Sequence, residues 1–481
     1  MASSPPIDAA GADVVVDLDD RGPAFPPLVL GTNVPAWLGP ERLASEELRA
    51  ATVESGATIL RMPGGSWSNS YDWRGCETHD RQACYFPDAA RPTDFIDFMQ
   101  ATGLEGMWTV SINDTAQSAA ALVAFFNGEV GDERSIGVDR WGRDWRTVDE
   151  WAALRSAGGN DEPVGLEWWE VGNEVYGGSP ESGGDDCAPF GWEDVWTCDG
   201  EEYVLGDDGH DGYLDIRAAM RDVDPDIQVG AVGVAEPVGW GDWGNEVIET
   251  ADDDLDFYVV HHYGFDDSPD PNEAVQRPAQ VWPGIVGHLT DRLGATPVAV
   301  TEYNLVSFGE ADTDRSMTQA VSALYLADTI GQLAWSGVTL ANQWNLANGT
   351  MSTGTDYGMV DADTFAPNPQ YHAMQAWRSA GETMLSAEVA DGSIRAYPTI
   401  HDDGRVTIVL LHLGSGEREV TIRLDGASTG GTAVRSGVHA EELAAGSMQH
   451  DVGDPISLVD GRFDLVVPPY SISTVEVSGA G

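Results

Sequence analysis

The sequence predicts a (β/α)8 barrel followed by an antiparallel β-sandwich, and three observations support this fold class. The chain has 481 residues, which suits a barrel of roughly 250 to 350 residues joined to an accessory domain. Up to about residue 378, short apolar or β-branched segments alternate with helical segments. Beyond that point the helical periodicity ends, and alternating strands are separated by Gly and Asp turns.

Eight segments have the length and apolar character of buried parallel strands. In chain order they are residues 29–33, 58–62, 107–112, 168–173, 227–232, 257–263, 298–302 and 338–344. Helical segments are predicted at residues 116–126, 212–223, 281–293 and 317–334. Because each strand is followed by a helix or a long loop, we predict a closed barrel over residues 25–378.

The second unit is predicted from strands in which apolar and polar side chains alternate. This pattern occurs at residues 394–397, 406–412, 419–424, 463–467 and 473–477. We therefore assign residues 379–481 to the β-sandwich. The segment 14–18 has strand character and no helix after it, so we expect residues 1–24 to add a strand to the sandwich.

The charge of the chain is strongly negative. It has 80 acidic and 24 basic residues, a formal net charge of -56, and no lysine, so every basic residue is arginine. Such a surface keeps a protein hydrated in molar salt and is typical of haloarchaeal proteins. The sequence contains no basic patch, so we exclude nucleic acids and anionic membranes as partners.

The cysteines indicate the cellular compartment in which the protein functions. They form two close pairs, Cys76 with Cys84 and Cys187 with Cys198, whose spacings fit local disulfides better than a zinc site. Four free thiols are the alternative. Disulfides favour an extracellular protein whose leader has been removed, because residues 1–12 do not resemble a signal peptide. No run of about 18 apolar residues is present, so we expect no membrane span.

Two acidic residues follow apolar strands at the end where barrels place their reactive groups. Glu174 follows the segment Trp-Trp-Glu-Val-Gly-Asn, and Glu302 follows Val-Ala-Val-Thr. A buried charge is costly unless it is paired or used in chemistry. A retaining glycosidase needs two facing carboxyl groups, and glutamates on the fourth and seventh strands would both lie at one barrel mouth. Membership of a buried ion pair is the alternative for each of them.

Glycosidic cleavage through a covalent intermediate needs two carboxyl groups in different states. One must be protonated to donate to the leaving oxygen, and the other must be ionised to attack the anomeric carbon. Burial beside tryptophan rings raises one pKa, and a donor such as arginine lowers the other.

Several motifs resemble those of clan A glycoside hydrolases, most of all the family 51 α-L-arabinofuranosidases and their family 39 and family 79 relatives. The matching segments are residues 169–174 (WEVGNE, the acid/base strand), 60–66 (LRMPGGS, the Arg-x-Pro-Gly-Gly of the second strand), 261–263 (HHY, the His-x-Tyr of the sixth strand), 301–303 (TEY, the nucleophile strand) and 467–471 (VPPYS, the last sandwich strand). The resemblance extends from about residue 13 to 478.

The resemblance implies a role for each matched residue. Glu174 corresponds to the acid/base, Glu302 to the nucleophile, and Asn173 to the amide that binds the sugar 2-hydroxyl. Arg61 corresponds to the arginine that keeps the nucleophile ionised.

Two further residues are implied to line the nucleophile's side, namely His261 and Tyr263. They lie two apart in one strand and share a face, whereas His262 points away; a structural histidine is the alternative for His261. The sequence departs from family 51 at Tyr303, where a tryptophan is usual, and at Trp67, where Asn-Phe often follows the glycines.

The remaining candidates are substrate-binding residues. Trp67 and Trp344 are expected to offer ring faces to a sugar, and Trp108 is expected either to join them or to pack in the core. Asn113, just after the third strand, is a further candidate. The long loop 175–210 is expected to shape the cleft.

We therefore expect a retaining glycosidase that acts on plant-type polysaccharide or oligosaccharide, with α-L-arabinofuranosidase as the first choice. An endo-β-glycanase or β-xylosidase of the same clan is the alternative, and a carbohydrate-binding barrel without activity comes third. No cofactor or metal is expected, because no phosphate-binding loop or zinc motif is present and the acidic residues 207–211 fit solvated surface better than a calcium site. The sugar, exo or endo action and the oligomeric state stay open.

Overall fold

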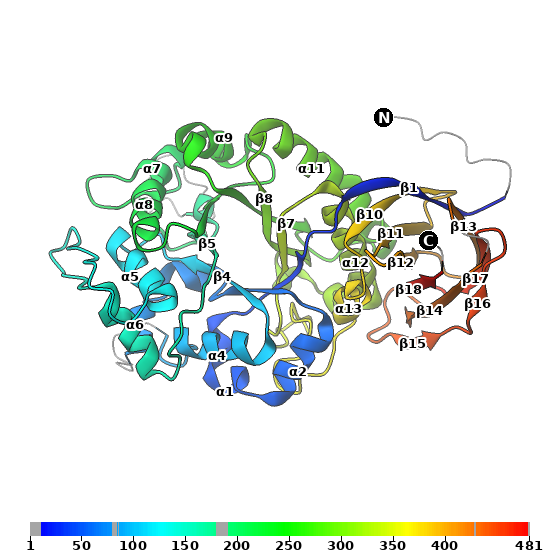
Figure 1. The fold of residues 1–481 in the computed structure, drawn as a ribbon, viewed down its shortest axis with the longest axis horizontal. Coiled ribbons are helices and arrows are strands. Elements are labelled where there is room, and N and C mark those ends of the chain that lie inside the picture. The colour runs from blue at the N-terminus through cyan, green and yellow to red at the C-terminus, as the bar shows by residue number, and fades with distance from the viewer. Residues whose placement is uncertain (1–10, 79–83, 85, 179–190, 428–429, 480–481) are drawn as a thin grey trace.

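The computed structural model describes residues 11–78, 84, 86–178, 191–427 and 430–479, which form a barrel and a separate sheet domain (Figure 1). Eight parallel strands close the barrel in chain order. They are β2 (Leu28–Asn33), β3 (Ile59–Met62), β4 (Glu105–Val110), β5 (Trp168–Val171), β6 (Gln228–Val232), β7 (Phe257–Phe265), β8 (Val298–Val306) and β9 (Leu340–Gln343). All eight predicted strands overlap these, so the predicted barrel is confirmed.

Helices surround the barrel on its outer side (Figure 1). They are α1 (Gly39–Leu43), α2 (Glu46–Ser55), α3 (Trp73–Glu77), α4 (Pro92–Thr102), α5 (Ala116–Asn127), α6 (Val148–Ala157), α7 (Gly200–Leu205), α8 (Tyr213–Val223), α9 (Gly239–Ala251), α10 (Pro271–Ala274), α11 (Arg277–Leu293), α12 (Ala320–Ser336) and α13 (Tyr371–Trp377). The predicted helices correspond to α5, α8, α11 and α12.

Among the helices that our sequence analysis does not predict, α2 has weak apolar periodicity and is marked instead at its ends. In α2, the Ser45 side chain accepts a hydrogen bond from the Leu48 N–H group and caps the first turn. Gly56 ends the helix in the left-handed conformation, with φ 87°. Capping residues of this kind do not predict the helix by themselves, because the helix also depends on packing against the barrel.

The barrel strands are enclosed by side chains inside the barrel and by helices outside it. All four residues of β3 and all nine of β8 are buried. Parallel strands in such barrels are covered on both faces, so their sequences read as continuous apolar runs. Arg61 in β3 and Glu302 in β8 interrupt these runs, and both must find their partners inside the barrel.

The second unit is one hydrogen-bonded sheet of ten strands. They are β1 (Val14–Ala24), β10 (Thr383–Val389), β11 (Ile394–Ile400), β12 (Val406–His412), β13 (Arg418–Asp425), β14 (Thr432–His439), β15 (Gln449–Val452), β16 (Ile456–Ser457), β17 (Arg462–Val467) and β18 (Ser471–Ser478). β1 pairs antiparallel with β10 and parallel with β13. The sheet therefore contains a parallel pair, which we do not predict.

Strands β10, β14, β15 and β16 also lie where no strand is predicted. β14 illustrates the reason, because its sequence does not alternate buried apolar with exposed polar residues: Val434 is exposed, Arg435 is buried and Gly437 lies inside the strand. Its eight residues are held by a continuous antiparallel ladder with β18. A partner distant in the sequence thus determines this strand.

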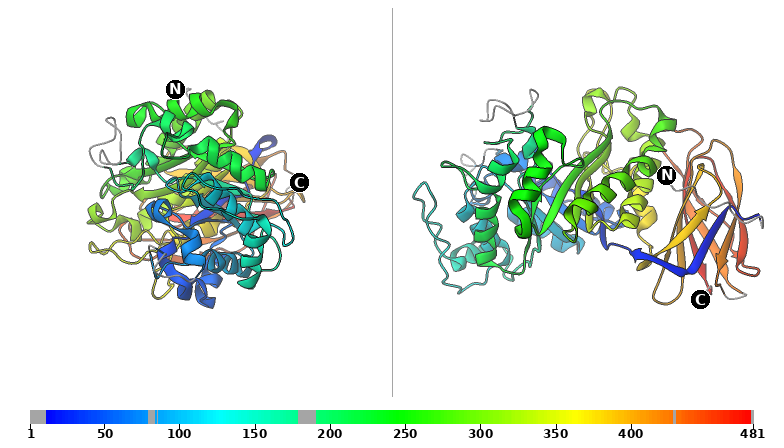
Figure 2. Two further views of the ribbon diagram at one scale, coloured as in Figure 1. Left: turned by 90° about the vertical axis from the view of Figure 1, so that its left-hand side faces the viewer. Right: turned by 90° about the horizontal axis from the view of Figure 1, so that it is seen from above.

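The sheet domain packs against one side of the barrel (Figure 2), where α13 contacts β18 and α12 contacts β12. Thr474 Oγ1 donates a hydrogen bond to the Ala376 carbonyl oxygen, 2.9 Å away, across this boundary. No helix in the described part of the chain has the length and apolar character needed to span a membrane.

Candidate active site

The two predicted catalytic glutamates meet at the carboxyl ends of the barrel strands. Glu174 follows β5 and Glu302 lies in β8. One carboxylate oxygen of each residue and one ring nitrogen of His261 lie within 4.8 Å of one another. The Glu302 side chain is 6% exposed and the Glu174 side chain is 17% exposed. The barrel thus presents two enclosed, facing carboxyl groups, with Glu174 the more accessible.

Glu302 is held from two neighbouring strands. Arg61 Nη1 donates to Glu302 Oε1 over 2.8 Å, and the Tyr263 hydroxyl donates to Oε2 over 2.8 Å. Arg61 extends from β3 and Tyr263 from β7, so the geometry brings together the residues that the resemblance places beside the nucleophile. With both oxygens fixed, the carboxylate has a defined orientation.

Glu174 stands in a left-handed backbone conformation, with φ 42°, at the start of η3 (Val175–Gly177). Its Oε1 lies 2.9 Å from His261 Nδ1 and accepts a hydrogen bond from the Tyr176 hydroxyl over 3.1 Å. Its Oε2 accepts a hydrogen bond from Trp192 Nε1 over 2.6 Å. Few residues other than glycine adopt this backbone conformation without an energetic cost, and residues that do so concentrate at functional sites.

His261 lies between the two carboxyl groups rather than on the nucleophile's side alone. Its Nδ1 is 2.9 Å from Glu174 and 3.7 Å from Glu302, and its Nε2 is 2.9 Å from the Thr301 hydroxyl. His262, as predicted, points away and meets Trp282 of α11 with ring centroids 5.0 Å apart.

The pKa values of the three groups are linked. Burial raises the pKa of Glu302, and the Glu174 charge adds to this, while His261, Arg61 and Tyr263 only partly oppose it, so the net pKa is raised. Burial would also raise the pKa of Glu174, but the hydrogen bonds from His261, Trp192 and Tyr176 outweigh it and the net pKa is lowered. Burial opposes protonation of His261, yet Glu302 and Glu174 raise its pKa.

These directions differ from the expectation that Arg61 alone keeps Glu302 ionised. Burial is the largest effect on the pKa of Glu302 and raises it; His261 and Arg61 lower this pKa, and the facing Glu174 carboxylate adds a smaller increase. The donors gathered on Glu174 favour its ionised form, so Glu302 is the better proton acceptor of the pair in this structure. The acid role predicted for Glu174 would therefore require a proton to reach it from within the site before the chemical step.

Arg61 connects the barrel interior to both catalytic positions. Besides Glu302, its guanidinium donates to Glu170 and, over 2.8 Å each, to Asn33 Oδ1 and Asn173 Oδ1. Our sequence analysis does not select Glu170 or Asn33. Glu170 lies in β5 and Asn173 follows the strand, and only the closed barrel reveals that both face Arg61.

A third buried glutamate, Glu193, completes the site and is absent from our predicted residues. Its Oε1 accepts hydrogen bonds from Asn173 Nδ2 over 2.9 Å and from the Ser66 hydroxyl over 2.7 Å. Its Oε2 accepts one from Asn69 Nδ2 over 2.7 Å. Burial and then the Glu174 charge raise the pKa of Glu193 to about 8. The raised pKa brings protonation of Glu193 close to neutral pH, and its Oε1 holds the amide of Asn173 in place.

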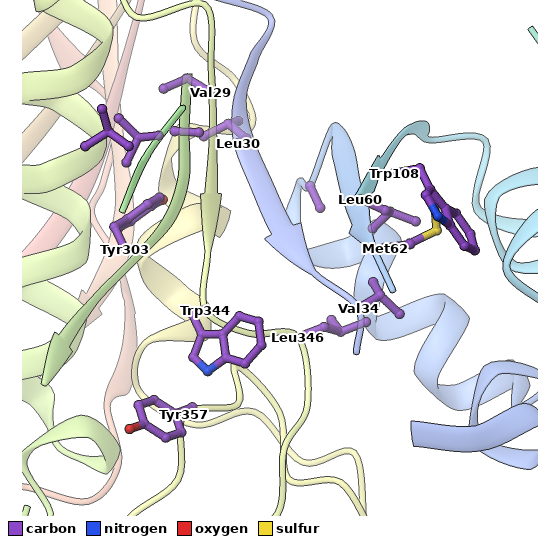
Figure 3. Close-up of a cluster of buried hydrophobic side chains, with 14 of the residues drawn as sticks. Val29, Leu30, Val34, Leu60, Met62, Trp108, Tyr303, Trp344, Leu346 and Tyr357 are labelled. Atoms are coloured by element: carbon purple, nitrogen blue, oxygen red, sulfur yellow. The ribbon is translucent and has the colours of Figure 1, made fainter. Parts of the chain in front are cut away.

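The predicted aromatic platform consists of rings that largely cover one another. Trp67, in η2 (Ser66–Ser70), stacks on Phe86 with centroids 3.7 Å apart, and Trp37 contacts both Trp67 and Trp344 edge-on. Trp344 is only 9% exposed and joins the hydrophobic cluster around Tyr357 (Figure 3). Trp108 is 1% exposed and belongs to the core.

Asn113 holds loops together in this structure. Its Nδ2 donates to the carbonyl oxygens of Asn69, at 3.0 Å, and Asp194, at 2.6 Å. It thereby connects the η2 segment to the loop that carries Trp192 and Glu193.

Of the cysteines, Cys76 and Cys84 form a disulfide, as predicted. Cys198 is also disulfide-bonded, but its expected partner Cys187 lies outside the described residues, so that pairing stays a prediction.

Glu174, His261 and Glu302 have donor atoms that a metal ion could use. However, the buried Arg61 guanidinium already lies 2.8 Å from Glu302 and supplies the positive charge at this place. Both oxygens of each glutamate also have protein donors. The arrangement suits acid, base and nucleophile chemistry better than metal binding.

Comparison with known proteins leads to α-L-arabinofuranosidases. No protein-family model matches the chain. The intracellular exo-α-(1→5)-L-arabinofuranosidase of Bifidobacterium longum is 26% identical over 227 residues, which cover 44% of this chain and 33% of that enzyme. The α-L-arabinofuranosidase C of Emericella nidulans is 21% identical over 487 residues, which cover 89% and 87% of the two chains.

Among solved structures, the GH51 α-L-arabinofuranosidase of Thermotoga petrophila superposes with a TM-score of 0.74 at 18% identity. The superposition covers 97% of this chain and 100% of that one. It establishes the shared fold of barrel and sheet domain. The Bifidobacterium match, in contrast, spans about a third of that relative's length.

Proposed function

We propose that this protein is a retaining glycoside hydrolase and that it acts as an α-L-arabinofuranosidase on plant-type polysaccharide or oligosaccharide. One observation carries the proposal, namely that carboxylate oxygens of Glu174 and Glu302 lie within 4.8 Å of each other at the barrel mouth. Retaining enzymes hold their carboxyl groups about 5 to 5.5 Å apart, whereas inverting enzymes need about 6.5 to 9.5 Å to admit a water molecule.

In the proposed first step, a Glu302 oxygen attacks the anomeric carbon and forms a covalent ester with the sugar. The glycosidic bond breaks, and the leaving oxygen takes the proton from Glu174. In the second step, Glu174 removes a proton from water, the resulting oxygen attacks the anomeric carbon, and the ester to Glu302 breaks. Two inversions at this carbon give net retention.

The surrounding residues support these steps. Arg61 and Tyr263 orient Glu302 and stabilise its negative charge. Within the described residues Asn173 Nδ2 donates to Glu193 alone, which leaves its second N–H for the sugar 2-hydroxyl. His261 lies between the carboxyl groups and is the natural carrier for the proton that must reach Glu174.

The curated relatives support arabinofuranose as the sugar, because both are named arabinofuranosidases. An endo-β-glycanase or β-xylosidase would use the same two glutamates, so the pair does not separate these activities. The presence of both glutamates with their donors argues against a carbohydrate-binding barrel without activity, which would not need them.

The test combines a substrate screen with two variants. Nitrophenyl α-L-arabinofuranoside, β-D-xyloside and β-D-glucoside, together with arabinan and xylan, are assayed in molar salt. Glu302→Gln is expected to remove nearly all activity while the fold is kept. Glu174→Ala is expected to cost least on substrates with good leaving groups, because these need little protonation, and added azide is expected to restore turnover by attacking the intermediate without a base. Inversion of the product anomer by NMR would contradict the mechanism.

We also infer an extracellular location and adaptation to high salt. The Cys76–Cys84 disulfide supports an oxidising environment. The net charge of -56 without lysine supports a surface adapted to molar salt. Cell fractionation of the source organism, with activity followed in medium and lysate, tests the location.

A further inference from the structure

Two exposed indole rings lie beside the proposed acid/base. Trp192 is 41% exposed, Trp240 is 46% exposed, and their rings meet edge-on with centroids 5.3 Å apart. Trp192 Nε1 donates to Glu174 Oε2 over 2.6 Å. Tyr176, whose hydroxyl also binds Glu174, has its ring 5.3 Å from Trp240 and 6.2 Å from Trp192. These aromatic residues therefore form one surface that is continuous with Glu174.

The backbone holds both rings in place. Trp240 has φ 55° and is followed by Gly241 and Asp242, which are also left-handed, with φ 74° and 78°. A tryptophan rarely adopts this conformation, and conformations of this kind persist where the surrounding structure imposes them. Trp192 lies flat on Gly177, where an added Cβ would be 2.6 Å from the indole. Both rings are thus presented to solvent by local constraints.

The exposed faces distinguish this pair from Trp67 and Trp344, the two residues predicted to bind sugar. Trp344 is 9% exposed, and Trp67 has one face covered by Phe86. Single exposed apolar side chains are common, but two exposed indoles in contact form a larger apolar surface, and an indole face suits the apolar C–H face of a sugar ring. The available stacking surface therefore lies on the Glu174 side of the site.

We propose that Trp192 and Trp240 form a binding platform for the first sugar residue on the leaving-group side. This inference rests on the proposed function, because it takes Glu174 as the proton donor to the leaving oxygen. The group attached to that oxygen must pass the Glu174 carboxyl, and the two indoles are the surface that it meets there. The leaving group that this site accommodates is accordingly a sugar of an oligosaccharide chain rather than a small aglycone.

Binding without turnover gives the direct test. In the Glu302→Gln background, an arabino-oligosaccharide and a xylan-derived oligosaccharide carrying arabinose are titrated by calorimetry, with and without Trp240→Ala. We expect Trp240→Ala to weaken the better ligand about tenfold, which corresponds to about 1.4 kcal/mol. Equal affinity in the two proteins, or no binding of either oligosaccharide at millimolar concentration, overturns the proposal.

The matched control is Trp335→Ala. Trp335 is 43% exposed but lies at the end of α12, against β1, where an added Cβ on Gly22 would be 2.6 Å from its ring. Barrel helices run antiparallel to the strands, so this end is remote from the mouth. Trp335→Ala is expected to bind the oligosaccharide as the parent does. An equal loss in both variants would show a general effect of tryptophan removal and overturn the assignment.

A second variant displaces the platform without deleting it. Gly177→Ala pushes the Trp192 indole, and we expect the ratio of kcat/KM on the oligosaccharide to kcat/KM on nitrophenyl arabinofuranoside to fall at least threefold. An unchanged ratio contradicts the platform.

Wild-type protein that hydrolyses no glycoside would instead refute the proposed function, while the calorimetric comparison still decides the platform. If light scattering shows that the protein is a dimer and that Trp240→Ala makes it a monomer, the two rings bind a second copy of the chain rather than a sugar. That result would overturn the proposal.

Discussion

The carboxyl group of Glu193 accepts hydrogen bonds from two asparagine amides, one on each oxygen. A glutamine cannot satisfy both amides, because its own N–H₂ group would face the N–H₂ group of either Asn69 or Asn173. A carboxyl group can, because each of its oxygens accepts one amide N–H, and the Ser66 hydroxyl also donates to Oε1. A positioning role for Glu193, exerted through Asn173, follows from this geometry.

A double-mutant cycle tests this role. We expect Glu193→Gln to lower kcat/KM about tenfold, or about 1.4 kcal/mol, because the Asn173 amide loses its fixed orientation. In an Asn173→Ala background the same change should cost less than about twofold, since coupled residues are not additive. Costs that simply add would contradict the role. Glu77→Gln, which removes another buried carboxyl group that accepts from Thr93, is the control and should leave kcat/KM unchanged.

His262 gives a prediction about stability and pH. Burial, and then the Arg277 charge, lower its pKa to about 4. Above pH about 6.5 the ring is neutral in both the folded and the unfolded protein. Between about pH 6.5 and 4 only the unfolded chain takes up the proton, so the free energy of unfolding falls as the pH falls. The loss is up to roughly 1.4 kcal/mol per pH unit.

The matching variant is His262→Phe, which keeps a ring against Trp282 and removes the titration. His262 Nε2 has no hydrogen-bond partner in the described part of the chain, so little is lost at pH 7. Urea unfolding at constant salt should show equal stability at pH 7 and a more stable variant by about 1 to 2 kcal/mol at pH 5. If the free energies of unfolding of the two proteins change in parallel with pH, His262 does not cause the loss of stability at low pH.

At the scale of single residues, local sequence identifies Glu174 and Glu302 because each ends an apolar strand within a recognisable motif. It also indicates Arg61, His261 and Tyr263 through the same motifs. Glu193 could not be found in this way, since it lies in a loop among many other acidic residues and acquires its role only through Asn69 and Asn173. Nothing in its neighbouring sequence separates it from a solvated acid.

Among the elements, β6 and β7 test how tightly the barrel is closed. Gly230 in β6 lies under the Phe257 ring of β7, and an added Cβ would be 2.1 Å from that ring. Gly230→Ala forces the ring or the strand to move, and we expect chemical denaturation to show a loss of about 1 to 3 kcal/mol. A change below about 0.5 kcal/mol would mean that the barrel adapts easily at this point.

Helix α11 provides the opposite case. An added Cβ on Gly287 would have no atom within 4 Å, and the residue lies inside the helix. Gly287→Ala should therefore raise the free energy of unfolding by about 0.5 to 1 kcal/mol, because alanine loses less backbone freedom on folding. Destabilisation in the same denaturation assay would contradict the helical environment described for this position.

Elements with strong patterns are predictable, and elements determined by distant partners are not. All eight barrel strands follow from apolar runs, because burial on both faces leaves a continuous signal. β14 and the parallel pairing of β1 with β13 depend on strands far away in the sequence. α2 depends on its caps and on the barrel it covers. The missing information is the tertiary environment.

At the scale of the molecule, the two units are joined by a buried polar contact. Asp328 of α12 accepts a hydrogen bond from the Tyr397 hydroxyl of the sheet domain, and Arg395 lies 3.5 Å from its other oxygen. α12 follows the strand that carries Glu302, so the sheet domain stabilises the outer layer behind the nucleophile. We propose that the units divide between α13 and β10, near residue 379.

The charge of the whole molecule determines the last prediction. With 80 acidic and 24 basic residues, the folded chain repels itself unless salt screens its surface, and the Debye length falls from about 10 Å at 0.1 M to about 3 Å at 1 M. The melting temperature should therefore rise steadily between about 0.1 and 3 M NaCl. Asp252→Asn with Asp253→Asn, in the exposed 3-10 turn Asp252–Asp254, should raise it at low salt and have little effect at 3 M. A level melting temperature across the series would contradict adaptation to high salt.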